Sequence, residues 1–396
     1  MTGFRPELRR NPAADLSDLA DHPGLADRIR TEIRASGPLP FARFMELALY
    51  DPDGGYYRSS EARPGRGGDF ITAPELHPIF GELLARGVED AWVALGRPHP
   101  FVVVEYGAGE GALAVPLLGA LPPAIGYHPV EIDERRVAGL RERLTDAGLA
   151  GRLVDPLPAS FDGVIVANEV LDALPVHRVV RRHDVLRELA VDIAANGSFV
   201  EVEIDPTTPA LHERLAVEGI ALVDGQTAEI ALGVDPWIRD AAAQLRQGLL
   251  ILIDYGAPAT ELYDPVRRRD GTLQAYVRHQ LSDDPYRFVG RQDLTAHVDV
   301  TAVQRAAEAA GLATLGVTTQ AEALMALGIE DRLREIQADP MTTMEGYTLL
   351  RASLLRLLDP AAMGRFRVMV FGRGWPPESP PRILRYRLPR LGGDAD

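Results

Sequence analysis

Apolar residues recur along the chain in two patterns that alternate with each other. Predominantly apolar runs of strand length lie at 101–104, 161–167 and 248–253, and segments with apolar residues at helical spacing lie between them. Buried strands that alternate with helices are typical of right-handed βαβ units in a parallel sheet. The pattern therefore predicts an α/β fold with a parallel sheet at its centre.

The same reasoning predicts the elements around these three strands. Asp133 can cap a helix that Gly148 closes, and Gly37-Pro38 ends an earlier helix. Further strands are expected at 126–130, 152–154 and 365–371. Helices are expected at 25–35, 41–49, 77–95, 112–118, 236–246, 301–310, 320–327 and 346–358.

Two segments interrupt the alternation. Short alternating strands at 177–180, 185–193 and 199–204, with a hairpin turn at Asn196-Gly197, predict an antiparallel β insertion. The segment 257–299 has little periodicity, and such a long loop in a compact protein is usually functional. We therefore expect three parts. Residues 1–74 contain a loosely held arm to about residue 24, two helices and a Gly-rich loop. Residues 75–375 form the core, with insertions at about 176–235 and 257–299, and residues 376–396 form a mobile Pro-rich tail.

Composition excludes several classes of protein. Among 396 residues, 57 are acidic and 42 basic, and the net charge of −15 argues against nucleic-acid binding, which needs a basic face. Without cysteine, disulfides and thiolate chemistry are excluded, and all 42 Lys-or-Arg positions are arginine, which excludes Schiff-base chemistry. The nine histidines lack metal-site spacing, so no metal is expected.

Location is judged from apolar runs and from coding bias. No apolar run approaches the roughly 20 residues of a bilayer span, so no membrane span is expected, and neither a signal nor a transit peptide is evident. The bias toward Ala, Arg, Gly and Pro is typical of GC-rich coding. We expect a bacterial cytoplasmic protein.

The segment 101–112 is the most informative stretch of the chain. An apolar strand ends in Glu105, and Gly107, Gly109 and Gly111 follow at alternate positions. Glycines leave no Cβ between the backbone and a ligand, and the N–H groups that open the next helix point at the same place. The turn predicts a nucleotide-type cofactor, although a glycine-rich turn without any ligand would give the same sequence.

Two cofactors compete for this turn. G-x-G-x-x-A at 107–112 also satisfies the dinucleotide fingerprint, whereas E-x-G-x-G resembles the first motif of Rossmann-like methyltransferases. The carboxyl ends of the strands are expected to carry a ring of polar residues: Glu105, Glu131, Asp155, Asn168, Glu169 and Asp254. Acids suit the sulfonium of S-adenosylmethionine better than the pyrophosphate of NAD. Glu131 would take the ribose hydroxyls, and Asp155 would lie near the adenine.

Asn168, Glu169 and Asp172 form the candidate acceptor site. They follow the strand at 161–167, and two carboxylates there could hold a guanidinium through fork-like hydrogen bonds. The alternative is that Glu169 and Asp172 are acids at the start of a helix. His177, His279 and His297 could line a pocket, but lone histidines are more often structural.

Several longer motifs resemble the MidA-like protein arginine methyltransferases, the family that includes the mitochondrial complex I assembly-factor methyltransferase. The resemblance runs from about residue 25 to 373. Ala108, Val170 and Leu171 depart from the family pattern, which often has Pro at the first and Phe at the other two. The motifs are those at 54–57, 68–75, 105–111, 130–131, 167–177, 254–256, 271–273 and 293–299.

The resemblance implies a Rossmann-like class I S-adenosylmethionine-dependent methyltransferase core with an N-terminal helical cap. It implies that the loop with Gly68, Asp69 and Phe70 closes over the cofactor. It also implies arginine methylation of a protein, a respiratory complex I-type subunit in the mitochondrial members, and a homodimer is possible. A small-molecule methyltransferase and a non-catalytic assembly factor that keeps the pocket are the alternatives.

Overall fold

The computed structural model describes residues 16, 18–58, 71–278 and 280–388. The chain divides into two compact units, each built from three separate stretches of sequence. Unit 1 comprises residues 1–72, 171–237 and 256–306, and unit 2 comprises 73–170, 238–255 and 307–396. No helix in the described part of the chain is long and apolar enough to span a membrane.

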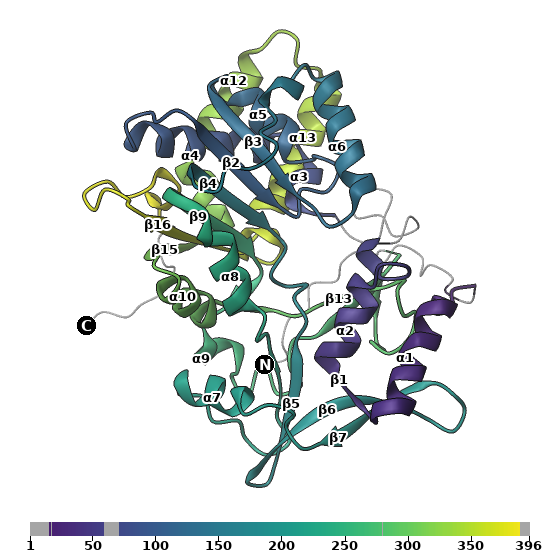
Figure 1. Ribbon diagram of the computed structural model, residues 1–396. Coiled ribbons are helices and arrows are strands. Elements are labelled where there is room, and N and C mark those ends of the chain that lie inside the picture. Colours follow the sequence, from purple (N-terminus) through teal and green to yellow (C-terminus); the bar gives the residue numbers. More distant parts are fainter. Residues whose placement is uncertain (1–15, 17, 59–70, 279, 389–396) are drawn as a thin grey trace. The chain divides into compact units, whose positions relative to one another are not determined.

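Unit 2 is built on a six-stranded sheet (Figure 1). Four parallel strands lie side by side in the order β9, β4, β2, β3, and β16 and β15 continue the sheet in antiparallel orientation beyond β9. Their bounds are β2 Phe101–Tyr106, β3 Ile125–Val130, β4 Phe161–Asn168, β9 Leu245–Asp254, β15 Ala313–Thr319 and β16 Arg367–Arg373.

Glycine sets the close approach of the central strands. A Cβ added at Gly163 in β4 would lie 1.9 Å from the carbonyl oxygen of Val102, and one at Gly248 in β9 would lie 1.8 Å from that of Gly163. Any larger residue would force these strands apart, so the two glycines lock the register of β2, β4 and β9. The register brings Tyr106 and Ala167 level with each other at the carboxyl edge of the sheet.

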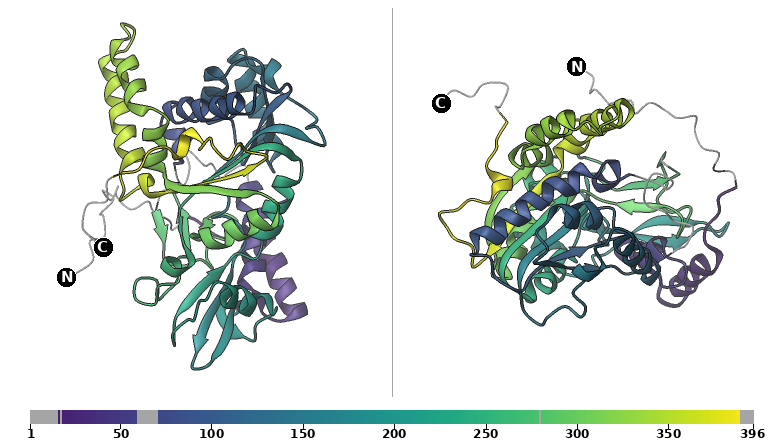
Figure 2. Two further views of the ribbon diagram at one scale, coloured as in Figure 1. Left: turned by 90° about the vertical axis from the view of Figure 1, so that its left-hand side faces the viewer. Right: turned by 90° about the horizontal axis from the view of Figure 1, so that it is seen from above.

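Helices cover the sheet of unit 2. In Figure 2, α12 and α13 run side by side, and a hydrogen bond from Gln337 to the hydroxyl of Tyr347 joins them. The helices are α3 Ala73–Leu76, α4 Ile79–Ala94, α5 Ala114–Ala120, α6 Glu134–Asp146, α11 Gln320–Ala326, α12 Ile329–Ala338 and α13 Met344–Leu358, with 3-10 turns η2 Ala150–Arg152, η3 Met363–Arg365 and η4 Arg382–Leu384. Two of the five boundaries between the units fall inside α8 (Val234–Ala243) and α10 (Val300–Ala309).

Unit 1 contains the predicted antiparallel insertion. Its five-stranded sheet combines β1 Leu39–Pro40, β5 His177–Arg182, β6 Val185–Ile193, β7 Phe199–Ile204 and β8 Thr227–Ile230. Phe41, Phe44 and Met45 of α2 pack into the same buried cluster as Val191 of β6. The other elements are α1 Pro23–Ser36, α2 Phe41–Tyr50, η1 Tyr56–Arg58, α7 Ala210–Val217, α9 Ala259–Leu262, and the small sheets β10 Gly256–Ala257 with β14 Val298–Asp299, and β11 Gln274–Val277 with β12 Gln280–Ser282 and β13 Asp293–Thr295.

Three expectations about local structure were wrong. Residues 152–154 do not form a strand: η2 ends at Arg152, and Leu153 makes a single parallel bridge to Tyr127. The tail is not loose as far as residue 388, because Ile383 is buried and the N–H of Arg382 donates to Asp90. The arm is held before residue 24, since Arg278 donates to both carboxylate oxygens of Asp18 at 2.9 Å.

Candidate active site

The glycine turn after β2 has a left-handed geometry that favours glycine. Gly107, Gly109 and Gly111 adopt φ values of 67°, 52° and 85°. A Cβ on Gly107 would also meet Val170 Cγ2 at 2.8 Å. The N–H of Gly107 donates to the carbonyl of Val130 at 2.9 Å, which ties the turn to the end of β3. The main chain is therefore bare of side chains at the point where the sequence predicts a cofactor.

Glu131 lies on this turn. One of its carboxylate oxygens accepts from the N–H of Gly109 at 2.9 Å. The other accepts from the N–H groups of Ile132 at 2.8 Å and Asp133 at 3.2 Å. Three main-chain donors thus fix the carboxylate between the turn and the start of α6. The structure brings Glu131 and the glycines together, as a ribose-binding acid beside a cofactor turn requires.

Glu105 was expected to be an acid of the polar ring at the strand ends, but the structure places its side chain in the interior. Its side chain is buried, and the hydroxyl of Tyr127 donates to it at 2.6 Å. Burial raises the pKa of Glu105 to about 8, the Tyr127 hydrogen bond opposes that rise, and the charge of Glu131 adds to it. Glu105 is therefore mostly a neutral acid at pH 7, so it contributes a hydrogen-bonding group and not a charge.

Asp155 is an exposed member of the ring. Its carboxylate accepts from the Arg141 guanidinium of α6 at 2.5 Å, and about half of the side chain (52%) remains exposed. The arginine balances the charge of this acid. At the edge near β2 and β3, Asp155 thus pairs with Arg141 and the neighbouring Glu110 with Arg143 at 3.1 Å, whereas Glu105 is mostly neutral.

Asn168 and Glu169 end β4 in an unusual conformation. Glu169 has φ of 53°, a left-handed value that costs a non-glycine residue about 1–3 kcal/mol and that concentrates at functional sites. Its N–H donates to the carbonyl of Ile253 at 2.8 Å, which holds the residue against β9. Its Oε1 accepts from Asn168 Nδ2 at 3.0 Å and from the N–H of Ala73 at 3.2 Å. The side chain is therefore oriented by both neighbours.

Asp172 belongs to unit 1, whereas Asn168 and Glu169 belong to unit 2. Asp172 is buried, and its carbonyl accepts from the N–H of Ala296 at 2.9 Å. Its charge helps to raise the pKa of Tyr57, for which burial is the largest cause. Gly68, Asp69 and Phe70, expected to cover the cofactor, lie outside the described residues.

Other polar residues named from the sequence have structural partners. His177 Nδ1 lies 2.7 Å from Glu188, whose other carboxylate oxygen accepts from the N–H and hydroxyl of Thr207. Asp254 is buried at the end of β9 and accepts from the N–H of Tyr255 at 2.9 Å. The N–H of His297 donates to Thr272 at 3.2 Å, and His279 lies outside the described residues. Within the described part of the chain, no group of three or more acids and histidines could hold a metal.

Comparison with known proteins identifies the class of this site. Residues 83–318 match the family described as "Putative S-adenosyl-L-methionine-dependent methyltransferase". A mitochondrial "Protein arginine methyltransferase NDUFAF7 homolog" of Drosophila melanogaster is 28% identical over 92% of this chain and 89% of its own length. The human protein arginine methyltransferase NDUFAF7 is 27% identical over 84% of this chain and 79% of its own length.

Two crystal structures from Burkholderia thailandensis share the fold across almost the whole chain. One, bound to S-adenosyl-homocysteine, is 36% identical over 92% of this chain and 95% of its own, with a TM-score of 0.82. The other, described as a native crystal structure, gives the same identity and coverage with a TM-score of 0.81. The glycine turn, the carboxylate fixed on it and these matches agree, and S-adenosylmethionine is the cofactor. The chain belongs to this family of S-adenosyl-L-methionine-dependent methyltransferases, and it is an enzyme of that class.

Proposed function

We propose that the enzyme methylates an arginine side chain on a protein. The names of the curated relatives, protein arginine methyltransferases, carry the proposal, together with the oriented carboxylate of Glu169 at the end of β4. A carboxylate fixed by two N–H donors presents its oxygens in a set direction, which suits a planar guanidinium.

In this proposal, the residues of the turn hold S-adenosylmethionine. Gly107, Gly109 and Gly111 give the cofactor access to the main chain, and Glu131 takes its ribose hydroxyls. Asp155 would lie near the adenine, and Glu105 would be a further cofactor-binding residue. Gly68, Asp69 and Phe70 would cover the bound cofactor. When bound, the cofactor supplies an electrophilic methyl group on a sulfonium.

The acceptor residues would act by positioning. Glu169 would bind the guanidinium, with Asn168 orienting Glu169, and Asp172 of unit 1 is kept as a separate candidate acceptor residue. A carboxylate in contact with the guanidinium also provides a group that can accept the proton released when nitrogen gains a methyl. Methyl transfer depends on in-line approach, and holding the two reactants in line can supply about 7–11 kcal/mol at best.

The protein substrate is the finer part of the proposal. We propose a complex I-type subunit, a homodimeric enzyme and a cytoplasmic location in a bacterium. A role in the assembly of complex I rests on the resemblance to the MidA-like family. The bacterial setting is supported by 36% identity to a Burkholderia thailandensis protein.

The test is methyl transfer from isotope-labelled S-adenosylmethionine to protein from a strain that lacks the gene. Mass spectrometry should find label on arginine with wild-type enzyme and a loss of about 100-fold or more with Glu169→Gln, since positioning groups contribute on that order. Glu142→Gln, on the exposed surface of α6, is the matched control and should retain activity.

Three results would contradict the proposal. Label confined to small molecules would identify a small-molecule methyltransferase. Full complementation of the strain by an inactive Glu169→Gln protein would identify an assembly factor. Calorimetry that shows binding of NAD but not of S-adenosylhomocysteine would overturn the cofactor assignment.

A further inference from the structure

Large apolar side chains gather on the outer side of α13 and on the turn before it. The exposed fractions are 83% for Met341, 80% for Met344, 54% for Leu349 and 72% for Leu355. The opposite side of the helix, with Leu350, Ser353, Leu354 and Leu357, is buried. α13 is thus apolar on both sides, which a helix that packs against a single neighbour does not need.

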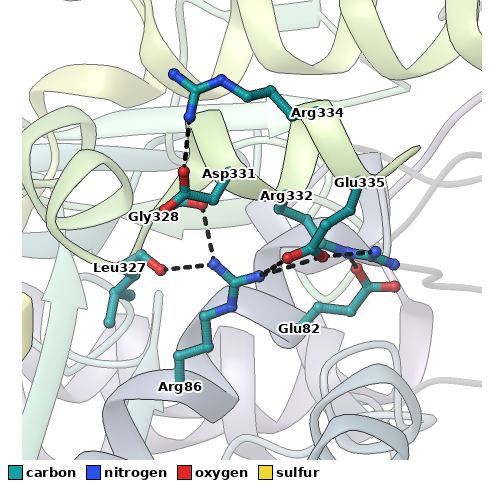
Figure 3. A network of polar contacts seen from close by, with 8 residues as sticks. All are labelled: Glu82, Arg86, Leu327, Gly328, Asp331, Arg332, Arg334 and Glu335. Carbon is teal, nitrogen blue, oxygen red and sulfur yellow. Dashed lines mark hydrogen bonds and ion pairs between the residues drawn. The ribbon is translucent and has the colours of Figure 1, made fainter. Parts of the chain in front are cut away.

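α13 is held in unit 2 both directly and through α12, which lies beside it and is bonded to α4. Arg86 of α4 donates to the carbonyls of Leu327 and Gly328, at 3.3 and 3.0 Å, and to Glu335 of α12 (Figure 3). Arg332 of α12 donates to Glu82 of α4 at 2.8 Å. On α13 itself, the hydroxyl of Ser353 donates to the carbonyl of Leu76 at 3.2 Å. The exposed apolar side chains therefore lie on an anchored helix.

Two opposite charges flank the exposed side. Glu345 and Arg356 are eleven positions apart, so they lie on one stripe with Leu349 and Ala352, about 16 Å from each other along the axis. Neither side chain forms an ion pair or hydrogen bond within the part of the chain that the structure describes. We call the exposed set Met344, Glu345, Thr348, Leu349, Ala352, Leu355 and Arg356 the α13 face.

We propose that the α13 face is the interface of the homodimer, an inference that rests on the homodimer of the proposed function: the face docks on the same face of a second copy of this chain, with the two helices antiparallel. A twofold axis between positions 350 and 351 brings Glu345 opposite Arg356 of the partner subunit, and the reverse pair forms at the other end. The same axis places Leu349 opposite Ala352 of the partner subunit, and the small alanine lets the helices approach.

The size of the α13 face limits the expected affinity of the dimer. A 15-residue helix is about 22 Å long, and one helix pair buries less than the roughly 800 Å² per partner of a standard interface. Arg351 lies beside the axis, where it would approach its equivalent, and this like charge lowers the affinity further. The dimer should therefore depend on protein concentration and on salt.

Sedimentation velocity of the full chain over a concentration series tests the proposal. The wild type should shift from monomer to dimer with concentration, and Leu355→Asp should weaken dimerisation at least tenfold. Glu345→Arg and Arg356→Glu should each weaken it, and the double variant should restore it, because the swapped charges again face each other. Val266→Asp changes an equally exposed apolar residue (88% exposed) elsewhere and is the control.

Circular dichroism verifies that each variant is folded. A wild type that stays monomeric at all concentrations would overturn the proposal. So would a double variant that dimerises no better than the single ones. Binding of a monomeric wild type to anionic lipid vesicles, lost in Leu355→Asp, would also overturn it and assign the face to a membrane surface.

Discussion

Glu105 and Tyr127 form a buried carboxyl–phenol pair next to the cofactor turn. The pKa of Glu105 is raised from 4.5 to about 8 in the folded protein, mainly by burial. The folded state therefore keeps a proton that the unfolded state loses between these two pH values, so this residue makes the folded state less stable as pH rises through that window. The contribution of Glu105 to the free energy of unfolding falls by at most about 1.4 kcal/mol per pH unit.

Glu105→Gln removes this slope, because an amide does not titrate. Urea unfolding at pH 5, 6.5 and 8 should show the wild type losing stability relative to the variant as pH rises. Glu218, whose pKa is also raised to about 8 by burial and by Asp299, titrates in both proteins and cancels in the comparison. Parallel stability curves would show that Glu105 is already ionised in the folded protein.

Gly107 is the second residue whose environment makes a sharp prediction. Gly107→Ala combines a left-handed φ of 67° with a contact of 2.8 Å to Val170 Cγ2, so it should cost about 1–3 kcal/mol and weaken S-adenosylhomocysteine binding more than tenfold. Val170→Ala in the same chain should recover part of the loss by removing the contact but not the backbone strain. Calorimetry measures the binding of S-adenosylhomocysteine by both variants.

The control is Gly119→Ala, where a Cβ meets nothing within 4 Å, and this variant should bind normally. A Gly107→Ala variant with unchanged binding would contradict the assignment of the turn.

Sequence reasoning named the candidate residues but not their states. The glycine spacing and the acids at the strand ends were sufficient to name Gly107, Glu131 and Glu169, because local chain direction fixes where they lie. The neutral form of Glu105 depends on its burial, which no local pattern contains, and the hydrogen bond that opposes it comes from a tyrosine 22 positions away. The left-handed φ of Glu169 depends on its bond to Ile253, on a strand from a distant stretch.

At the scale of elements, burial decided which predictions succeeded. The strands β2, β4 and β9 are buried on both faces and give nearly continuous apolar runs, so their existence was predicted correctly. β15 was missed because it is an edge strand of mixed polarity, with Gly316 beside an irregularity in its register. The segment 257–299 contains a three-stranded sheet of very short strands, which periodicity cannot detect.

The start of α6 offers a test at this scale. Asp133 is buried, and its carboxylate accepts from the N–H of Arg135 at 3.0 Å, as an N-cap should. Asp133→Ala should cost about 1 kcal/mol, within a usual range of 0.5–2. Asp133→Asn keeps an oxygen acceptor and should cost much less, as measured by urea unfolding at pH 7. Equal losses in both variants would assign the effect to the ion pair with the Arg135 guanidinium at 2.8 Å instead of to the cap.

The two units alternate along the sequence, and each takes three stretches of the chain. The chain passes from unit 2 to unit 1 after residue 170 and returns after residue 237, so strands of one sheet are separated by a stretch of the other unit. In unit 2, β4 pairs with β2 on one side and with β9 on the other. The end of β4 and the start of β9 at Leu245 are nevertheless separated by 76 positions of the sequence. Contacts at such separation cost loop-closure entropy that is recovered only when the sheet is complete. The cofactor turn lies on the first stretch, but the sheet that supports it needs all three.

A fragment of residues 73–170 should therefore fail to fold, although it contains the turn and Glu131. It keeps β2, β3 and β4 but exposes the edge of β4 that normally pairs with the buried run Leu249–Ile253 of β9. Circular dichroism should show no cooperative melting for this fragment. A chain that joins 73–170, 238–255 and 307–396 with flexible Gly/Ser linkers restores all six strands and should melt cooperatively. Cooperative melting of the short fragment would show that β2, β3 and β4 suffice as a folding unit, and the later strands would then be additions to a stable core.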